Sequence, residues 1–144
     1  MENQETERID ALHREATSYK DKKEWEKAII CLREADSLKN KTSTIYPIKH
    51  YLRLPLFLQQ AGRFDESMQE FEKLINESEQ RVLSWLPKRN ISSKKMLIHA
   101  ELYEIYKAMS TACKREKLLE LSKKYLALHE KHKAEHRKLM NNKK

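Results

Sequence analysis

The stretch WEKAIICLREA at residues 25–35 places small or apolar residues three, seven and ten positions after the bulky Trp25. The same spacing recurs 39 residues later in FDESMQEFEKL, residues 64–74, which begins with Phe64. Each stretch follows apolar residues at helical spacing, namely Leu12, Ala16 and Tyr19 in the first case and Tyr51, Pro55 and Leu58 in the second. We therefore expect one helical hairpin used twice. Such units stack into solenoids that bind other molecules.

The composition predicts an all-α fold. The 144 residues include one glycine, Gly62, and three prolines, which is too few turn residues for a strand-rich architecture. Good helix formers dominate the rest of the chain. A chain of this length supports one domain with a modest core, and we expect it to cover residues 1–139, followed by a frayed basic tail at 140–144.

Apolar periodicity predicts helices over residues 6–20, 22–38, 45–60, 64–84, 93–112 and 114–139. Asp21 and Glu24 have the spacing of a capping box for the second helix, and Ser92 or Ser93 is a candidate cap for the fifth. Pro55 falls inside the third helix, where it costs roughly 3 kcal/mol unless the helix kinks or packing offsets the loss. The last helix begins with Leu118, 54 residues after Phe64, so the pair at 93–139 is a degenerate third unit.

The two hairpins resemble tetratricopeptide repeats. The repeats cover residues 9–40 and 48–79, and Ala61-Gly62-Arg63-Phe64-Asp65-Glu66-Ser67 is similar to the family's turn and second-helix start. Two residues depart from the family pattern: Pro55 stands where a small residue is usual, and Ser67 replaces an alanine. The resemblance implies a short right-handed α-solenoid of about six antiparallel helices. It also implies that the first helix of each repeat lines a concave binding face.

That face predicts a protein or peptide partner. The expected contacts lie on the helix at 45–60: Lys49, His50, Arg53 and Gln60. Lys49 and Arg53 are one helical turn apart, so both can meet one acidic segment of a partner; a solvated basic face is the alternative. The function we expect is a non-catalytic adaptor. A small inhibitor or immunity-type protein fits the same residues, and the run Leu118, Leu121, Tyr125, Leu128, His132 leaves a homodimer open.

Charge is unevenly distributed along the chain. Residues 1–85 carry a net charge of −2 and residues 86–144 carry +10. A basic C-terminal third attracts nucleic acid or an acidic protein, although a solvated face with a lysine-rich tail explains it equally well. The candidate contacts, beside which Trp85 is available to stack on a base, are Lys88, Arg89, Lys94, Lys95, Lys114, Arg115, Lys117, Lys123 and Lys124.

Nothing in the sequence indicates an enzyme or a cofactor. A single glycine cannot build a phosphate-binding loop. His132, Glu135 and His136 match a zinc-protease pattern, but the sequence supplies no third ligand for catalytic zinc, so we expect no metal site and regard this run as a polar helix end. Cys31 and Cys113 lie in separate helices and favour free thiols. The longest nearly uncharged run, 54–62, is too short to cross a membrane, and the acidic N-terminus is unlike a signal peptide, so we expect a cytoplasmic protein.

Overall fold

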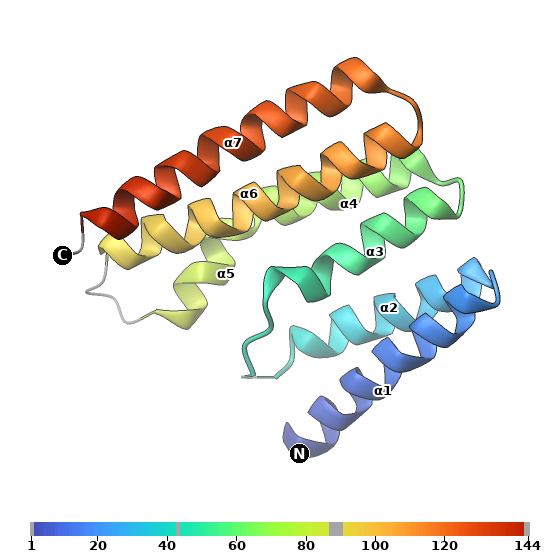
Figure 1. The fold of residues 1–144 in the computed structure, drawn as a ribbon. Coiled ribbons are helices and arrows are strands. Elements are labelled where there is room, and N and C mark those ends of the chain that lie inside the picture. The colour runs from blue at the N-terminus through green and yellow to red at the C-terminus, as the bar shows by residue number, and fades with distance from the viewer. Residues whose placement is uncertain (1, 43, 87–90, 143–144) are drawn as a thin grey trace. The chain divides into compact units, whose positions relative to one another are not determined.

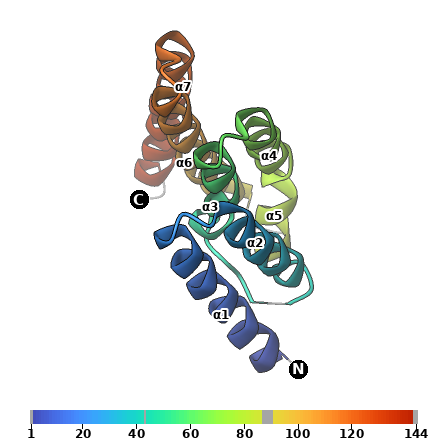
Figure 2. The ribbon, with the colours of Figure 1, turned by 90° about the vertical axis from the view of Figure 1, so that its right-hand side faces the viewer.

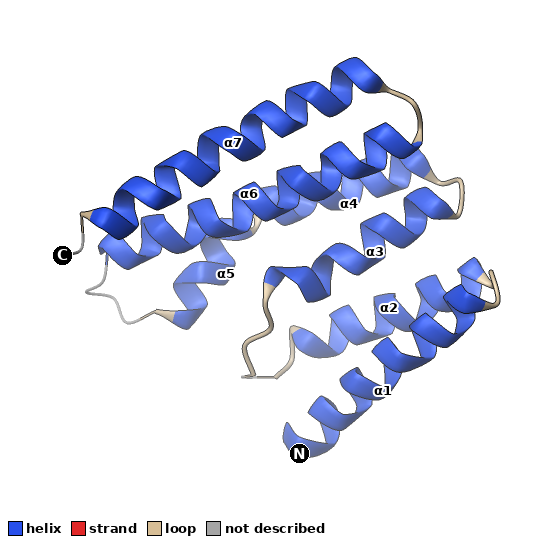
Figure 3. Ribbon diagram, in the orientation of Figure 1, coloured by secondary structure: helices blue, strands red, loops and turns tan. Residues whose placement is uncertain are grey.

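The computed structural model describes residues 2–42, 44–86 and 91–142, without the side chains of residues 2, 3, 91 and 92. Every regular element in these ranges is a helix, which confirms the all-α prediction (Figures 1 and 3). The elements are α1 (Glu2–Asp21), α2 (Trp25–Lys39), α3 (Ile48–Gln60), α4 (Phe64–Asn76), α5 (Ser78–Trp85), α6 (Ile91–Arg115) and α7 (Leu119–Asn141). The predicted bases Lys88 and Arg89 lie outside the described residues.

The chain divides into two compact units, Met1–Glu70 and Phe71–Lys144, with the boundary inside α4. Charge divides at the same place. The first unit holds 12 Lys/Arg and 13 Asp/Glu, a net charge of −1, whereas the second holds 18 and 9, a net charge of +9. The charge asymmetry in the sequence is therefore an asymmetry between two folded units.

Three inter-helix turns, at residues 19–24, 58–63 and 113–118, share one backbone geometry. In each turn the fifth residue has a positive φ: 60° at Lys23, 81° at Gly62 and 63° at Lys117. The next amide then donates to the carbonyl five residues back, at 2.8 Å from Glu24 to Tyr19, 2.8 Å from Arg63 to Leu58 and 2.9 Å from Leu118 to Cys113. These bonds satisfy carbonyls at the end of the preceding helix.

The shared turn fixes which residues of the following helices correspond. Trp25, Phe64 and Leu119 each begin the helix after the turn. The sequence pairing of Phe64 with Leu118 was therefore wrong by one residue, because Leu118 occupies the place of Glu24 and Arg63 as the residue before the helix. The correct separation is 55 residues.

The predicted capping box at Asp21 is also wrong. Asp21 is the last residue of α1, and Glu24 precedes α2 without a side-chain capping bond. The left-handed turn at Lys23 places the chain so that a backbone bond, rather than the Asp21 carboxylate, closes the junction. The predicted serine cap fails too, because α6 begins at Ile91 and Ser93 lies inside it. Pro47, expected within the first helical turn, immediately precedes α3 instead.

The helix expected over 64–84 is broken between α4 and α5. Arg81 donates from Nη2 to the carbonyl of Leu74 at 2.6 Å. The Glu101 carboxylate of α6 holds Arg81 at 2.8 Å and accepts the Ser78 hydroxyl at 2.8 Å. A side chain from the next helix therefore takes a carbonyl at the end of α4 and fixes the start of α5 against α6. This break is why the described chain has seven helices where six were expected.

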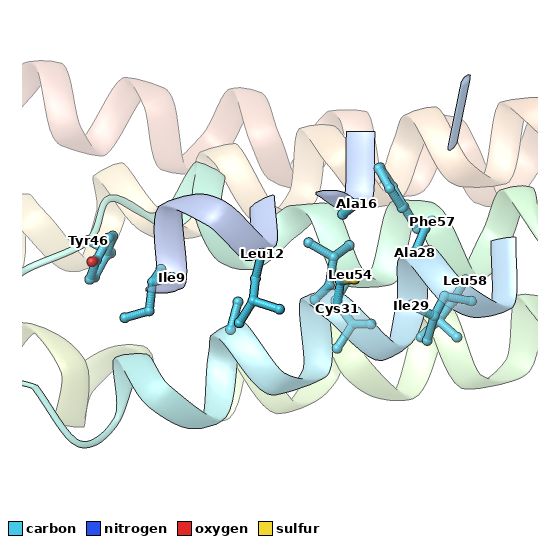
Figure 4. Close-up of a cluster of buried hydrophobic side chains, with 12 residues drawn as sticks. Ile9, Leu12, Ala16, Ala28, Ile29, Cys31, Tyr46, Leu54, Phe57 and Leu58 are labelled. Atoms are coloured by element: carbon cyan, nitrogen blue, oxygen red, sulfur yellow. The ribbon is translucent and has the colours of Figure 1, made fainter. Parts of the chain in front are cut away.

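Helices α1, α2 and α3 bury the core of the first unit. Helix α1 packs along α2, and α2 packs on α3 (Figures 1 and 2). Their apolar side chains, together with Tyr46 just before α3, interlock in one cluster, which is drawn in Figure 4. The cluster consists of Ile9, Leu12, Ala16, Ala28, Ile29, Cys31, Leu32, Ala35, Tyr46, Leu54, Phe57 and Leu58.

Pro55 stays inside α3, and a neighbouring helix supports it. The Pro55 carbonyl accepts the hydroxyl of Ser67 from α4 at 2.6 Å, and both residues are buried. This bond accounts for a serine at the position where the resembling family has alanine. The sequence analysis left open whether a kink or packing offsets the cost of this proline, and the Ser67 bond is a packing contact that does so.

The α6–α7 pair of the second unit has a polar and aromatic seam. Ser110 and Ser122 exchange hydroxyl bonds, each donating to the other's backbone carbonyl at 2.9 Å. Further along the pair, Tyr106 stacks on Tyr125 and Tyr103 meets His129 edge-on. Contacts of this kind are directional, so they fix the register of two helices more tightly than leucine contacts do.

Candidate functional site

Three of the four predicted partner contacts on α3 are engaged inside the first unit. Gln60 donates to the carbonyl of Leu56 in its own helix at 3.3 Å. His50 and Arg53 contact residues of α1, as detailed below. Lys49 is exposed and is the only one of the four whose side chain faces solvent fully. The structure therefore does not gather these residues into one open surface.

Arg53 ties α3 to α1. Its Nη1 donates to Nδ1 of His13 at 2.8 Å and to the His13 carbonyl at 3.0 Å, while Nη2 donates to the Thr17 hydroxyl at 2.7 Å. A guanidinium has only donors to offer, so Nδ1 of His13 is unprotonated and the ring proton sits on Nε2. Arg53 thus orients a neutral histidine, a role that helical spacing alone does not reveal.

Lys39, the last residue of α2, is a buried cation that sequence reasoning placed in a polar loop. Its side chain is 0% exposed. Its Nζ contacts the Asp36 carboxylate at 3.0 Å and the His50 carbonyl at 3.3 Å, and lies 4.8 Å from the ring centroid of Tyr51. Burial lowers the pKa of Lys39, and the Asp36 carboxylate opposes that change. The missed signal was its position seven residues after the buried Leu32.

Burial and these cations favour the neutral form of two histidines. Burial, followed by the charges of Lys39 and Arg53, lowers the pKa of His13 to about 3. Burial and Lys39 also lower the pKa of His50, whose ring lies between those of His13 and Tyr46. Buried Nε2 of His13, Nδ1 of His50 and the Tyr46 hydroxyl have no hydrogen-bond partner among the described residues. The cluster joins α1, α2 and α3 and is sensitive to acid.

The described predicted bases of the second unit fall into two groups. Lys94 and Lys95 lie in the first turns of α6, where Lys94 pairs with Glu79 at 3.0 Å. The larger group surrounds the α6–α7 turn about 28 Å away along the helix. It consists of Lys114, Arg115, Lys117, Lys123 and Lys124, all exposed. We call these five residues the basic turn.

Apolar side chains are exposed beside the basic turn. Leu118 and Leu119 are 41% and 57% exposed, and Leu126 and Met140 lie exposed further along α7. The sequence analysis placed Leu118 as the first apolar residue of the last helix, and this is wrong because the shared turn places it before the helix. Exposed leucines flanked by lysines have the make-up of a contact surface, with an apolar centre and a charged rim.

The histidine-rich end of α7 belongs to the helix seam. Nδ1 of His132 lies 2.9 Å from Nδ1 of His99 in α6, and Nδ1 of His129 contacts the Tyr103 carbonyl at 2.6 Å. Burial lowers the pKa of His99 and His132. Among the described residues no three His, Cys, Asp or Glu side chains are grouped to hold a metal ion.

The two cysteines have no reactive surroundings. Cys31 and Cys113 are free and buried, and burial raises the pKa of both thiols. Raised thiol pKa values disfavour the nucleophilic thiolate. Across the described helices, none combines the length and apolar character needed to traverse a bilayer.

Comparison of the chain with protein-family models, with curated proteins and with solved structures found no match. The function is therefore inferred from the residues of this chain alone.

Proposed function

We propose that the chain is a non-catalytic protein-interaction module that binds an acidic partner. The observation that carries the proposal is the basic turn with the exposed Leu118 and Leu119 beside it. An acidic partner would meet the lysines with opposite charges and bury the leucines. Protein interfaces commonly have such an apolar centre and a charged rim. An inhibitor that blocks a macromolecular complex would use the same surface.

The proposed architecture is a short right-handed solenoid of antiparallel helices resembling tetratricopeptide repeats. Three turns with one hydrogen-bond pattern support it, because repeat proteins reuse one local unit. The bulky residue that begins each following helix, Trp25, Phe64 or Leu119, also supports it. In this proposal the binding surface lies on the last unit, not on α3 as the sequence suggested, since His50, Arg53 and Gln60 already bind within the first unit.

Nucleic acid is the second candidate, favoured by the five charges of the basic turn. Phosphate contacts release counterions, so binding through the five bases of the basic turn would weaken by about 500-fold between 50 and 200 mM salt. Protein binding with an apolar centre loses far less over that range. The salt response of any complex therefore separates the two candidates.

Affinity capture with the full chain tests the proposal. The bait is the unmodified protein, and the extract is divided into portions with and without nuclease. We expect a protein that survives nuclease and is lost with Lys117→Glu/Lys124→Glu. The matched control is Lys22→Glu/Lys23→Glu in the corresponding turn of the first unit, which should retain the partner. Loss of every partner on nuclease treatment would instead assign the basic turn to nucleic acid.

A further inference from the structure

Helices α2 and α7 correspond in position, and one face that is buried in α2 is exposed in α7. Because Trp25 corresponds to Leu119, Leu32 corresponds to Leu126 and Lys39 to Lys133, at positions one, eight and fifteen of the two helices. These positions lie two helical turns apart and share a face. We call Leu119, Lys123, Leu126, Glu130, Lys133, Arg137 and Met140 the outer face of α7.

In α2 the corresponding face is covered by another helix. The Trp25 ring meets the Phe57 ring of α3 at 5.6 Å, edge to face. Leu32 is 1% exposed in the cluster that contains Phe57 and Leu58. At the far end, Lys39 donates to the His50 carbonyl in the first turn of α3. One helix therefore covers this face of α2 from end to end.

In α7 the same positions are open. Leu119 is 57% exposed and Leu126 is 37% exposed, and Met140 continues the apolar row. The seam with α6 runs along the neighbouring side of the helix, through Ser122, Tyr125 and His129. Three apolar side chains in one exposed row are more than a solvated helix face usually carries, because the solvent side of a surface helix is normally polar.

The charge around the row indicates what can cover it. Lys123, Lys133 and Arg137 lie on the outer face with a single acid, Glu130, and all are exposed. At the equivalent of Lys123, α2 carries Ile29, which is 2% exposed. Lys123 has an acidic neighbour in its own helix, Glu120 at 3.7 Å. A second apolar helix like α3 would cover Lys133 and Arg137 without adding acids, whereas a helix with acids beside its apolar row would supply partners for them.

We propose that the outer face of α7 binds an amphipathic, acidic helix of a partner protein, which packs on α7 as α3 packs on α2. The inference rests on the proposed function and names its surface and the chemistry of its partner. Leu119 and Leu126 contact apolar residues in one row of the bound helix. Lys123, Lys133 and Arg137 meet Asp or Glu side chains along its edges.

A synthetic peptide of about 20 residues, long enough to form a helix, supplies the probe. It carries leucine at two positions in each heptad and glutamate at the flanking positions, with a fluorescent label for anisotropy titration. Two further peptides have lysine in place of glutamate or the same residues in scrambled order. We expect the acidic amphipathic peptide to bind at least tenfold more tightly than either.

Two variants of the full-length chain assign the site. Leu119→Ser/Leu126→Ser should weaken binding of the acidic peptide at least tenfold, and Lys123→Glu/Lys133→Glu should reverse the preference between acidic and basic peptides. The control is Leu83→Ser, which removes a leucine of α5 that is 48% exposed and should leave affinity unchanged. Equal affinity of the unmodified chain and both variants would overturn the inference.

Other occupants give distinct results. A dimer in sedimentation that dissociates with Leu119→Ser/Leu126→Ser would assign the face to a second copy. Cosedimentation with phosphatidylserine vesicles, lost in the same variant, would assign it to an anionic membrane surface; either result overturns the inference. If the capture experiment returns a nuclease-resistant partner that is lost with Lys117→Glu/Lys124→Glu but tolerates Leu126→Ser/Lys133→Glu, which changes the outer face beyond the basic turn, the proposed function stands and this inference fails.

Discussion

The α1–α2 and α6–α7 pairs share one turn but pack with different chemistry. Both turns contain a lysine with a φ near 60° and the same backbone bond across five residues. Beyond the turn, α1 and α2 meet through small and aliphatic side chains such as Ala16 and Ala28. The α6–α7 pair instead meets through serine, tyrosine and histidine. A local backbone motif therefore sets where the second helix starts, while the seam residues set register and acid sensitivity.

The largest expected effect is the loss of stability when a leucine is truncated at a buried position of α2, compared with the exposed corresponding position of α7. Leu32→Ala should lower the free energy of unfolding by about 2–5 kcal/mol, because it leaves a cavity in a packed cluster. Leu126→Ala, at the corresponding position of α7, should cost about 1 kcal/mol or less, because that side chain is 37% exposed and its removal leaves no closed cavity. Urea unfolding followed by circular dichroism measures both, and similar losses would break the distinction between the two faces.

Acid should weaken the first unit through His13. The folded pKa, about 3, lies below the ordinary value near 6.5, so between these values the unfolded chain binds a proton that the folded chain does not. Stability contributed by neutral His13 is complete above pH 6.5 and is lost as pH falls. From pH 7 to 5 the loss is up to about 2 kcal/mol.

His13→Gln should flatten that pH dependence, because glutamine accepts from Arg53 without titrating. The corresponding change in the polar seam, His99→Gln, should flatten it less, since His99 is the more exposed of the two histidines. Urea unfolding at several pH values provides the measurement. An unchanged slope in His13→Gln would show that other groups carry the acid response.

The sequence predicted the helices better than their ends and contacts. The repeated spacing from Trp25 and from Phe64 identified corresponding helices, because apolar periodicity is local. The break before Ser78 was missed, since it depends on Arg81 held by Glu101, a residue of another helix. The spacing of apolar residues within one helix contains no information about a hydrogen bond to a residue in another helix.

The candidate site shows the same division. The bases that the charge counts singled out around Lys117 are exposed, and their role as partner contacts stays a prediction. The periodicity of α3 did not reveal that Arg53 faces His13 of α1, since a basic residue at the edge of an apolar stripe can turn toward either neighbour. The exposed Leu119 was missed because the correspondence had been drawn one residue early. Only the turn hydrogen bonds fix that register.

A smaller effect on stability is expected at one position where the α1–α2 and α6–α7 seams differ, Ala28 in the first and Ser122 in the second. Ser122→Ala should lower the free energy of unfolding by about 1 kcal/mol, because its hydroxyl donates to the buried Ser110 carbonyl. The reciprocal change, Ala28→Ser, introduces a hydroxyl at a fully buried site packed by apolar groups and should cost a similar amount. If either change is neutral in urea unfolding, the two seams are interchangeable at this position and the contrast between them is weaker than their contacts indicate.

The smallest effect concerns the shared turn itself. A left-handed conformation costs a residue with a Cβ about 1–2 kcal/mol, and the lost backbone freedom of glycine in the unfolded chain offsets about 0.4–1 kcal/mol of that. Gly62→Ala should therefore cost about 0.5 kcal/mol, and nothing lies within 4 Å of the added Cβ to increase the cost. Lys23→Gly and Lys117→Gly should each gain about as much. Small changes of these signs in thermal unfolding would support one turn used three times, whereas a loss above about 2 kcal/mol at Gly62 would show that its turn carries a constraint absent from the two lysine turns.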